Sequence, residues 1–231
     1  MTERQQKHVW IAIPAYTGTI HLGTMRSIIS DMLLLAERGD RVTIFDESGN
    51  AMIGDCRGLI VAKFLDGDGT DLVFVDSDVI WEAGALVRLV DYPVDFVAGL
   101  YPQRRDPINF CCRWLAKPEI ELSEHGLIEV DGVPAGFMRM GRAMLEKMTH
   151  QYADTVFHCD DAPNKEAHDL FGPYRVGRLK FGEDYSFCRR WRDIGGQIWV
   201  DPEIRMGHVG YKTFMGHVGE WLKGQSDGAD N

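Results

Sequence analysis

The chain has 231 residues, of which 45% are hydrophobic and 26% are charged, and its formal net charge is −10. This length and composition fit one globular α/β domain with a sizeable core. An acidic surface repels polyanions, so nucleic acid is excluded as an expected partner. A local basic pocket for a diphosphate is compatible with any net charge.

Neither membrane insertion nor secretion is expected. The apolar runs are strand-sized, and none approaches the roughly 20 residues that a membrane span needs. Residues 1–7 are polar, unlike a secretory signal. The five cysteines are odd in number, irregularly spaced and without a CxxC pair, which favours a reduced, cytoplasmic setting and gives no sign of a zinc site.

The first hundred residues alternate between strand-like and helix-like segments. Short apolar runs predict strands at 9–13, 41–45, 71–76 and 96–100. Helical spacing of apolar residues predicts helices through Leu22, Met25, Ile28, Ile29, Met32, Leu33 and Ala36, through Ile53, Cys56, Ile60 and Phe64, and over residues 83–90. This alternation predicts a mostly parallel central sheet with helices on both faces.

Polar groups gather where three of these strands end. The ends read Pro14-Ala15-Tyr16, Asp46-Glu47-Ser48 and Asp76-Ser77-Asp78. Sheets of this kind bind their ligands beyond the carboxyl ends of the strands, so these segments predict a binding edge.

The pattern becomes irregular after residue 101. A polar loop at 101–107 carries Arg104 and Arg105. Short strands are expected at 110–115, 127–130, 137–140 and 197–200, and helices at 142–148 and 183–194. Between them, Asp160–Arg178 is rich in turn-forming residues and is expected to be a long loop, a feature that is usually functional or mobile.

Asp76 and Asp78 form the strongest single motif. The pair follows an almost wholly apolar strand, and two carboxylates two residues apart can converge on a hard cation such as Mg²⁺ or Mn²⁺. Such a cation would neutralise a diphosphate. A solvated acidic turn is the alternative interpretation.

Two further motifs have chemical potential. Glu183 and Asp184 open a predicted helix, where they either interact with the helix dipole or accept a proton from a substrate hydroxyl. His208 lies in a Gly-His-Val-Gly segment that is expected to be a loop, and its imidazole is either a packing group or a metal ligand.

Taken in order, these segments resemble the GT-A glycosyltransferases, especially small bacterial and phage-borne members of the family-2 type. The matching stretches span roughly residues 9–210 and read IPAY, FDESGN, DCRGLIVAKFL, LVFVDSD, FVAGLYPQR, GFMRM, GEDYSFCRRWRDIGGQIWVDPEI and GHVG. The resemblance implies one GT-A domain at 8–222, with a nucleotide-binding half at 8–100 and an acceptor-side half with a small mixed β region at 101–222. The polar residues 223–231 are expected to form a disordered tail.

The resemblance also implies roles for single residues. It assigns the metal, Mn²⁺ or Mg²⁺, to Asp76, Asp78 and His208, and proton abstraction to Asp184 beside Glu183. Binding of the nucleotide-diphosphate sugar is implied for Pro14, Tyr16, Asp46, Arg57, Asp76 and Ser77. Glu47 after Asp46 departs from the commoner small or acidic-Gly arrangement, which leaves the donor base open.

The resulting hypothesis is sugar transfer from a nucleotide-diphosphate sugar to a hydroxyl of a glycan, lipid or small molecule, with inversion favoured over retention. A nucleotidyltransferase is the alternative enzyme, although residues 16–23 lack the basic, Gly-rich loop that such enzymes carry after the first strand. A binding module without turnover is the non-enzymatic alternative. A dehydrogenase is disfavoured because no G-x-G-x-x-G follows the first strand.

Overall fold

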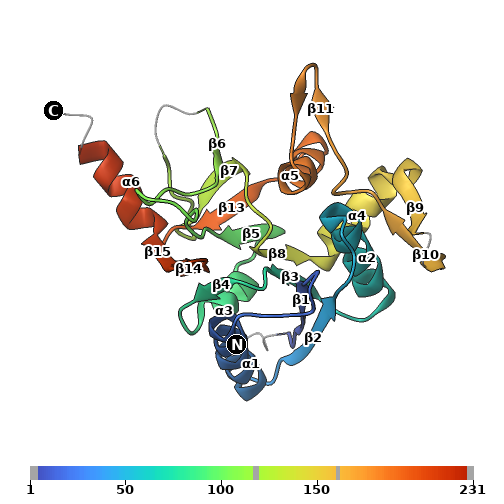
Figure 1. Cartoon of the computed structure of the whole chain (residues 1–231), viewed down its shortest axis with the longest axis horizontal. Helices are drawn as coiled ribbons and strands as arrows, with labels where there is room; N and C mark the ends of the chain where they lie inside the picture. Colours follow the sequence, from blue (N-terminus) through green and yellow to red (C-terminus); the bar gives the residue numbers. More distant parts are fainter. Residues whose placement is uncertain (1–4, 117–119, 160–161, 228–231) are drawn as a thin grey trace.

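The structure, a computed structural model, describes residues 5–116, 120–159 and 162–227 (Figure 1). Its centre is an eight-stranded sheet. In spatial order the strands are β2 (Arg41–Glu47), β1 (His8–Pro14), β3 (Asp71–Val75), β8 (Phe137–Gly141), β5 (Phe96–Gly99), β13 (Ile198–Asp201), β7 (Ile128–Gly132) and β6 (Arg113–Trp114).

The sheet is mixed: three of its seven strand pairs are parallel and four are antiparallel, but six of the eight strands run in one direction, which agrees with the predicted mostly parallel sheet. β1 runs parallel to both β2 and β3, and β13 runs parallel to β5. β8 lies between β3 and β5 and is antiparallel to both, so β3 and β5 point the same way. The polar ends of β1, β2 and β3 therefore meet at one edge.

Helices cover both faces of the sheet, which confirms the predicted layering. α1 (Leu22–Glu37) and α3 (Ala85–Asp91) pack on one face, in a core that contains Ile28 and Leu86. α2 (Ile53–Asp66), α4 (Arg142–Gln151) and α5 (Glu183–Asp193) pack on the other, in a core that contains Phe64 and Phe187. In the described part of the chain, no helix is long and apolar enough to cross a membrane.

A small antiparallel sheet lies beside the carboxyl end of β3. It consists of β15 (Thr213–His217), β14 (Arg205–Val209) and β4 (Val79–Trp81), in that order. β4 follows the Asp76–Asp78 turn directly, and its Val79 pairs with His208. His208 therefore lies in a strand, and the expected loop at this position is wrong because the β14–β15 pairing extends through Val209.

The expected long loop at Asp160–Arg178 is also wrong. Its first part continues a hairpin of β9 (Val156–Cys159) and β10 (Ala162–His168), which follows a short 3₁₀ helix (Ala153–Thr155). Its last part forms a second, projecting hairpin of β11 (Arg175–Val176) and β12 (Leu179–Lys180), seen at the top of Figure 1. Residues 160–161 lie outside the described residues. Cross-strand pairing overrides the low strand propensity of these polar segments.

The boundary of the predicted tail also needs correction. α6 (Val218–Asp227) carries the chain past residue 222, so residues 223–227 are helical, and residues 228–231 lie outside the described residues. Val218 is buried and Trp221 packs against the core, which anchors the start of this helix.

Candidate active site

The strand register brings the predicted donor-binding segments together. Pro14 pairs with Glu47, and Ala12 pairs with Phe74, which places Asp76 just beyond the same edge. Backbone hydrogen bonds extend the pairing to Tyr16, whose carbonyl accepts from Gly49 N at 3.0 Å. Pro14 is buried, whereas Tyr16 and Asp46 are exposed. The edge therefore offers an aromatic ring and a carboxylate to solvent.

Asp76 is joined to the start of α5 by a buried arginine. Arg57, on α2, donates from Nη2 to Asp76 Oδ1 at 3.0 Å and from Nη1 to Glu183 Oε1 at 2.9 Å. Burial lowers the pKa of Arg57, but the two carboxylates outweigh it and hold the pKa above its usual value. Arg57 thus holds two predicted site residues that are distant in sequence.

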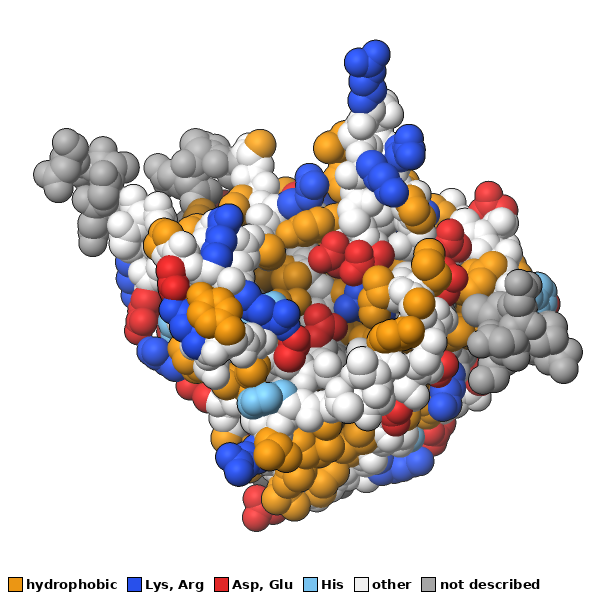
Figure 2. Space-filling model, viewed as in Figure 1, with side chains coloured by type: hydrophobic (Ala, Val, Ile, Leu, Met, Phe, Trp, Pro, Cys, Tyr) orange, Lys and Arg blue, Asp and Glu red, His pale blue; other side chains and the backbone are white. Residues whose placement is uncertain are grey.

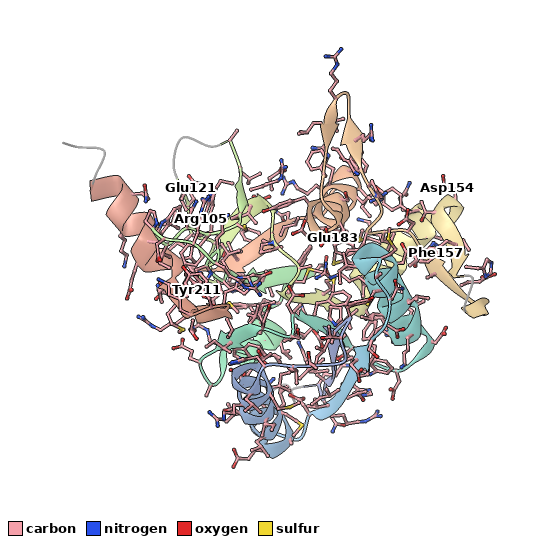
Figure 3. The ribbon with its side chains drawn as sticks, in the orientation of Figure 1. Arg105, Glu121, Asp154, Phe157, Glu183 and Tyr211 are labelled. Carbon is pink, nitrogen blue, oxygen red and sulfur yellow. The ribbon has the colours of Figure 1, made fainter. Side chains whose placement is uncertain are left out.

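Figure 2 shows a hollow in this face of the molecule with acidic side chains beside it, and Figure 3 labels Glu183 in the same part of the molecule, between α5 and α2. Arg57 and Asp76 come from the first half of the chain and Glu183 from the second, so both halves contribute side chains to the site.

Asp78 and His208 form a second pair in the site. His208 Nδ1 lies 3.0 Å from the carbonyl oxygen of Pro102, and because a carbonyl can only accept, this contact assigns the ring proton to Nδ1. Nε2 therefore presents its lone pair, 3.6 Å from Asp78 Oδ1. Burial and the charge of Arg104 lower the pKa of His208, which keeps the ring neutral.

This pair has the chemistry of metal ligands. Two cis ligands of an octahedral ion, each about 2.1 Å from it, lie about 3 Å apart, so a small adjustment lets Asp78 and His208 share a divalent cation. The Pro102 carbonyl is the kind of partner that orients a ligating histidine. Arg104 now forms an ion pair with Asp78. In the described residues no group of three or more His, Cys, Asp or Glu side chains is arranged to hold a metal. Asp76 Oδ1 is bonded to Arg57.

Asp184 is the most perturbed acid of the site. Burial, followed by the charge of Glu183, raises the pKa of Asp184 to about 6. Its Oδ1 accepts from the backbone N of Tyr185 at 2.7 Å. A carboxyl group with this pKa loses its proton near neutral pH and regains it readily, as a proton acceptor in catalysis must.

Ser77 contributes through its backbone. Its carbonyl accepts from His21 N at 2.8 Å, which ties the Asp76–Asp78 turn to the residue that caps α1. No hydrogen bond of the Ser77 side chain is found in the described structure, so its expected contact with the donor stays a prediction.

Tyr101 and Gly136 form the floor of the site and were not predicted. The Tyr101 hydroxyl accepts from Gly136 N at 3.2 Å, and Gly136 O accepts from Asp76 N at 3.0 Å. A Cβ atom at residue 136 would overlap both the Tyr101 hydroxyl and the Asp76 carboxylate. The glycine that opens the GFMRM segment was the available signal in the sequence, but its contacts with Tyr101 and Asp76 come from distant parts of the chain.

A cavity of 620 Å³ lies elsewhere, near the amino ends of β5 and β13. Its lining includes Asp95, Lys147, Trp191 and Trp199, and no predicted site residue. The volume of that cavity therefore does not mark the candidate site, which rests on the chemistry at the carboxyl ends of the strands.

No family model and no curated protein sequence matches this chain. Among solved structures, A197 from STIV aligns with a TM-score of 0.54 and 17% identity, over 89% of this chain and 86% of A197. GalNAc-T7, crystallised with UDP, GalNAc and Mn²⁺, aligns with a TM-score of 0.55 and 11% identity, over 89% of this chain but only 43% of GalNAc-T7. At these identities the likeness concerns the fold alone, and the fold is GT-A-like, as the sequence predicted.

Proposed function

We propose that this protein is a glycosyltransferase that moves a sugar from a nucleotide-diphosphate sugar to a hydroxyl acceptor, with Mn²⁺ or Mg²⁺ on the diphosphate. The observation that carries the proposal is Asp184, whose pKa of about 6 suits a base and whose neighbour Glu183 is tied through Arg57 to Asp76. The GT-A-like fold supports the proposal, as does its neighbour GalNAc-T7, which was crystallised with UDP, GalNAc and Mn²⁺.

On the donor side, Asp78 and His208 would hold the cation, with Asp76 nearby. When bound, the cation supplies positive charge that neutralises the leaving diphosphate. The hydrogen bond from Arg57 keeps the Asp76 carboxylate oriented. Tyr16, Pro14 and Asp46 lie along the edge where the nucleoside would extend, and Ser77 lies between the two aspartates.

On the acceptor side, Asp184 would act as general base. The acceptor oxygen attacks the anomeric carbon, the bond from that carbon to the diphosphate oxygen breaks, and the hydroxyl proton passes to Asp184. Attack from the face opposite the leaving diphosphate inverts the anomeric configuration. Glu183 stays paired with Arg57 and raises the pKa of Asp184, which strengthens it as a base.

The test combines nucleotide binding with turnover. Calorimetry should show that UDP or GDP binds at least about tenfold more tightly with Mn²⁺ than with a chelator, because uncompensated diphosphate is repelled by Asp76 and Asp78. Asp78→Asn should remove most of this difference. Equal affinity with and without metal contradicts the metal role.

Turnover is measured as nucleoside diphosphate released from a panel of nucleotide sugars. Asp184→Asn should abolish release while nucleotide affinity stays within a few-fold, because the group acts on the acceptor. Asp154→Asn is the matched control, an exposed aspartate that lies away from Glu183 in Figure 3. Release of pyrophosphate would instead indicate a nucleotidyltransferase, and binding without any turnover would indicate a binding module.

A further inference from the structure

Helix α1 presents apolar side chains to solvent. Leu22 is 71% exposed, Leu33 is 60% exposed and Ile29 is 42% exposed. All three lie on one side of the helix, because they are separated by seven and four residues. Figure 2 shows a broad apolar patch at the lower end of the molecule, where Figure 1 places α1. Surface patches of this kind mark interaction sites.

The opposite side of α1 is buried, and its polar side chains Asp31 and Ser27 are held by hydrogen bonds. Asp31, with no exposed surface, accepts from Trp81 Nε1 at 3.0 Å and from Leu86 N at 2.8 Å. Ser27 Oγ donates to the carbonyl of Trp81 at 2.8 Å. Turning the helix to bury Leu33 would break these bonds and expose the first turn of α3. The outward direction of the apolar side is therefore set by the fold.

The spacing of the outward side is that of a helix-packing seam. Leu22, Ile29 and Ala36 lie seven residues apart, and Met25 and Met32 follow the first two of them by three residues. This is the a/d pattern of residues that insert between the side chains of a second helix. A flat partner surface would not require this repeat.

Charged residues beside the seam can pair with those of a second copy of the same helix. Arg26 and Glu37 are both exposed, and their separation of eleven residues, close to three helical turns, places them on the same flank. In an antiparallel pair of identical helices, Arg26 meets Glu37 of the partner subunit, and two-fold symmetry makes this contact twice. A cluster of lysines and arginines, which an anionic membrane would need, is absent from the described α1 residues.

We propose that this protein forms a symmetric homodimer through antiparallel packing of α1 against α1 of a second copy. The proposal is independent of the glycosyltransferase assignment. Its consequence for the site follows from one bond: His21, which caps α1, donates its backbone N–H to the Ser77 carbonyl between Asp76 and Asp78. A second copy packed on α1 would therefore stabilise the helix whose first residues are bonded to the Asp76–Asp78 turn.

The experiment is sedimentation velocity on the full chain and its variants. At about 10–100 µM, the apparent molecular mass of the wild-type protein should be twice that of the chain, because a dimer with micromolar Kd is populated at this concentration. Arg26→Glu and Glu37→Arg should each raise the dimer Kd at least about tenfold, because each creates two like-charge contacts. The double variant should restore the dimer, since the exchanged charges pair again.

A second variant tests the exposed apolar side of α1 next to the seam. Leu33→Glu should yield monomers with unchanged circular dichroism, because the side chain is already exposed, and with the unfolding temperature that the wild-type protein shows at concentrations too low for dimers. Val176→Glu, at an exposed apolar position on the β11–β12 hairpin, is the matched control and should leave the dimer intact. A monomeric wild-type protein at these concentrations overturns the proposal. The proposal is also overturned if the double variant, Arg26→Glu with Glu37→Arg, does not regain the dimer that each single change weakens. Flotation of the wild-type protein with anionic vesicles, abolished by Leu33→Glu, would overturn it as well.

Discussion

Replacing Asp184 by Asn should abolish sugar transfer and yet make the protein more stable at neutral pH. Burial raises the pKa of Asp184 in the folded protein to about 6, against an ordinary value of 3.8. Ionising this carboxyl therefore costs the folded state about 3 kcal/mol more than it costs the unfolded chain. Because the group is partly accessible, solvent screening reduces this figure, and we expect a gain of about 1–2 kcal/mol in Asp184→Asn.

The sign and the pH window follow from the two pKa values. Below pH 3.8 the carboxyl is protonated in both states and contributes no difference. As pH rises from about 4 to 6, the unfolded chain ionises first, so the wild-type protein loses the stability that the retained proton provides. Above about pH 7 the carboxyl is ionised in both states, and the loss is complete and constant. Asn cannot ionise, and its oxygen can still accept from Tyr185 N, so the variant avoids the loss.

Urea unfolding of metal-free protein, repeated from pH 4.5 to 8, measures this difference. The free energy of unfolding of Asp184→Asn minus that of the wild type should grow as pH rises and level off above about 7. Asp154→Asn should show no such trend, since its carboxyl is exposed. A variant that is less stable at all pH values, or a difference that does not change with pH, would refute the placement of Asp184 in a desolvated site.

Other predictions address the remaining parts of the site. Transfer activity should rise with pH to a plateau with a midpoint near 6, and Glu183→Gln should move the midpoint lower, because Glu183 helps raise the pKa of Asp184. Arg57→Met should cost about 3–5 kcal/mol in urea unfolding, because it leaves two carboxylates without their shared cation, and a loss below 1 kcal/mol would contradict that role. Gly136→Ala should weaken nucleotide binding measured by calorimetry, because the added methyl group overlaps Asp76. Saturating UDP or GDP with Mn²⁺ should slow tryptic cleavage at Arg178 if the β11–β12 hairpin closes over the donor, and an unchanged rate excludes that closure.

The sequence predicted those helices and strands whose own apolar residues mark them as buried. β3 is apolar after its first residue, Asp71, and Phe187 lies on a helix with clear periodicity, so the sequence indicates both elements without reference to their neighbours. The sequence did not predict the polar hairpins, because no apolar pattern of their own marks their strands. β11 and β12 have only two residues each, and the turn between them is set by Gly177 with φ of 59°, a preference that the sequence shows only as a turn former.

The orientation of α1 illustrates a deeper limit. The apolar repeat correctly predicts a helix, but the side that the helix buries is decided by Asp31, whose partners lie on β4 and at the start of α3. Contacts between distant segments outweigh the periodicity. The same holds for Arg57, which the resemblance placed near the nucleotide, whereas its bonds to Asp76 and Glu183 depend on the packing of α2 against α5.

The two arginines of the site have different exposures, and this difference fits the proposed chemistry. The candidate site contains four carboxylates, those of Asp76, Asp78, Glu183 and Asp184. Without compensating positive charge, their mutual repulsion would push them apart. Arg57 is buried and bonded to two of them, so its charge is permanent and cannot leave without unfolding the site. Arg104 lies on an exposed loop, with 42% of its side chain accessible, and pairs with Asp78. A divalent cation and Arg104 cannot occupy the same side of Asp78, so a cation arriving with the diphosphate would displace Arg104, which is then free to pair with the phosphate oxygens. In this proposal the buried arginine keeps the site assembled, and the exposed one would balance the charge of Asp78 until a cation replaces it.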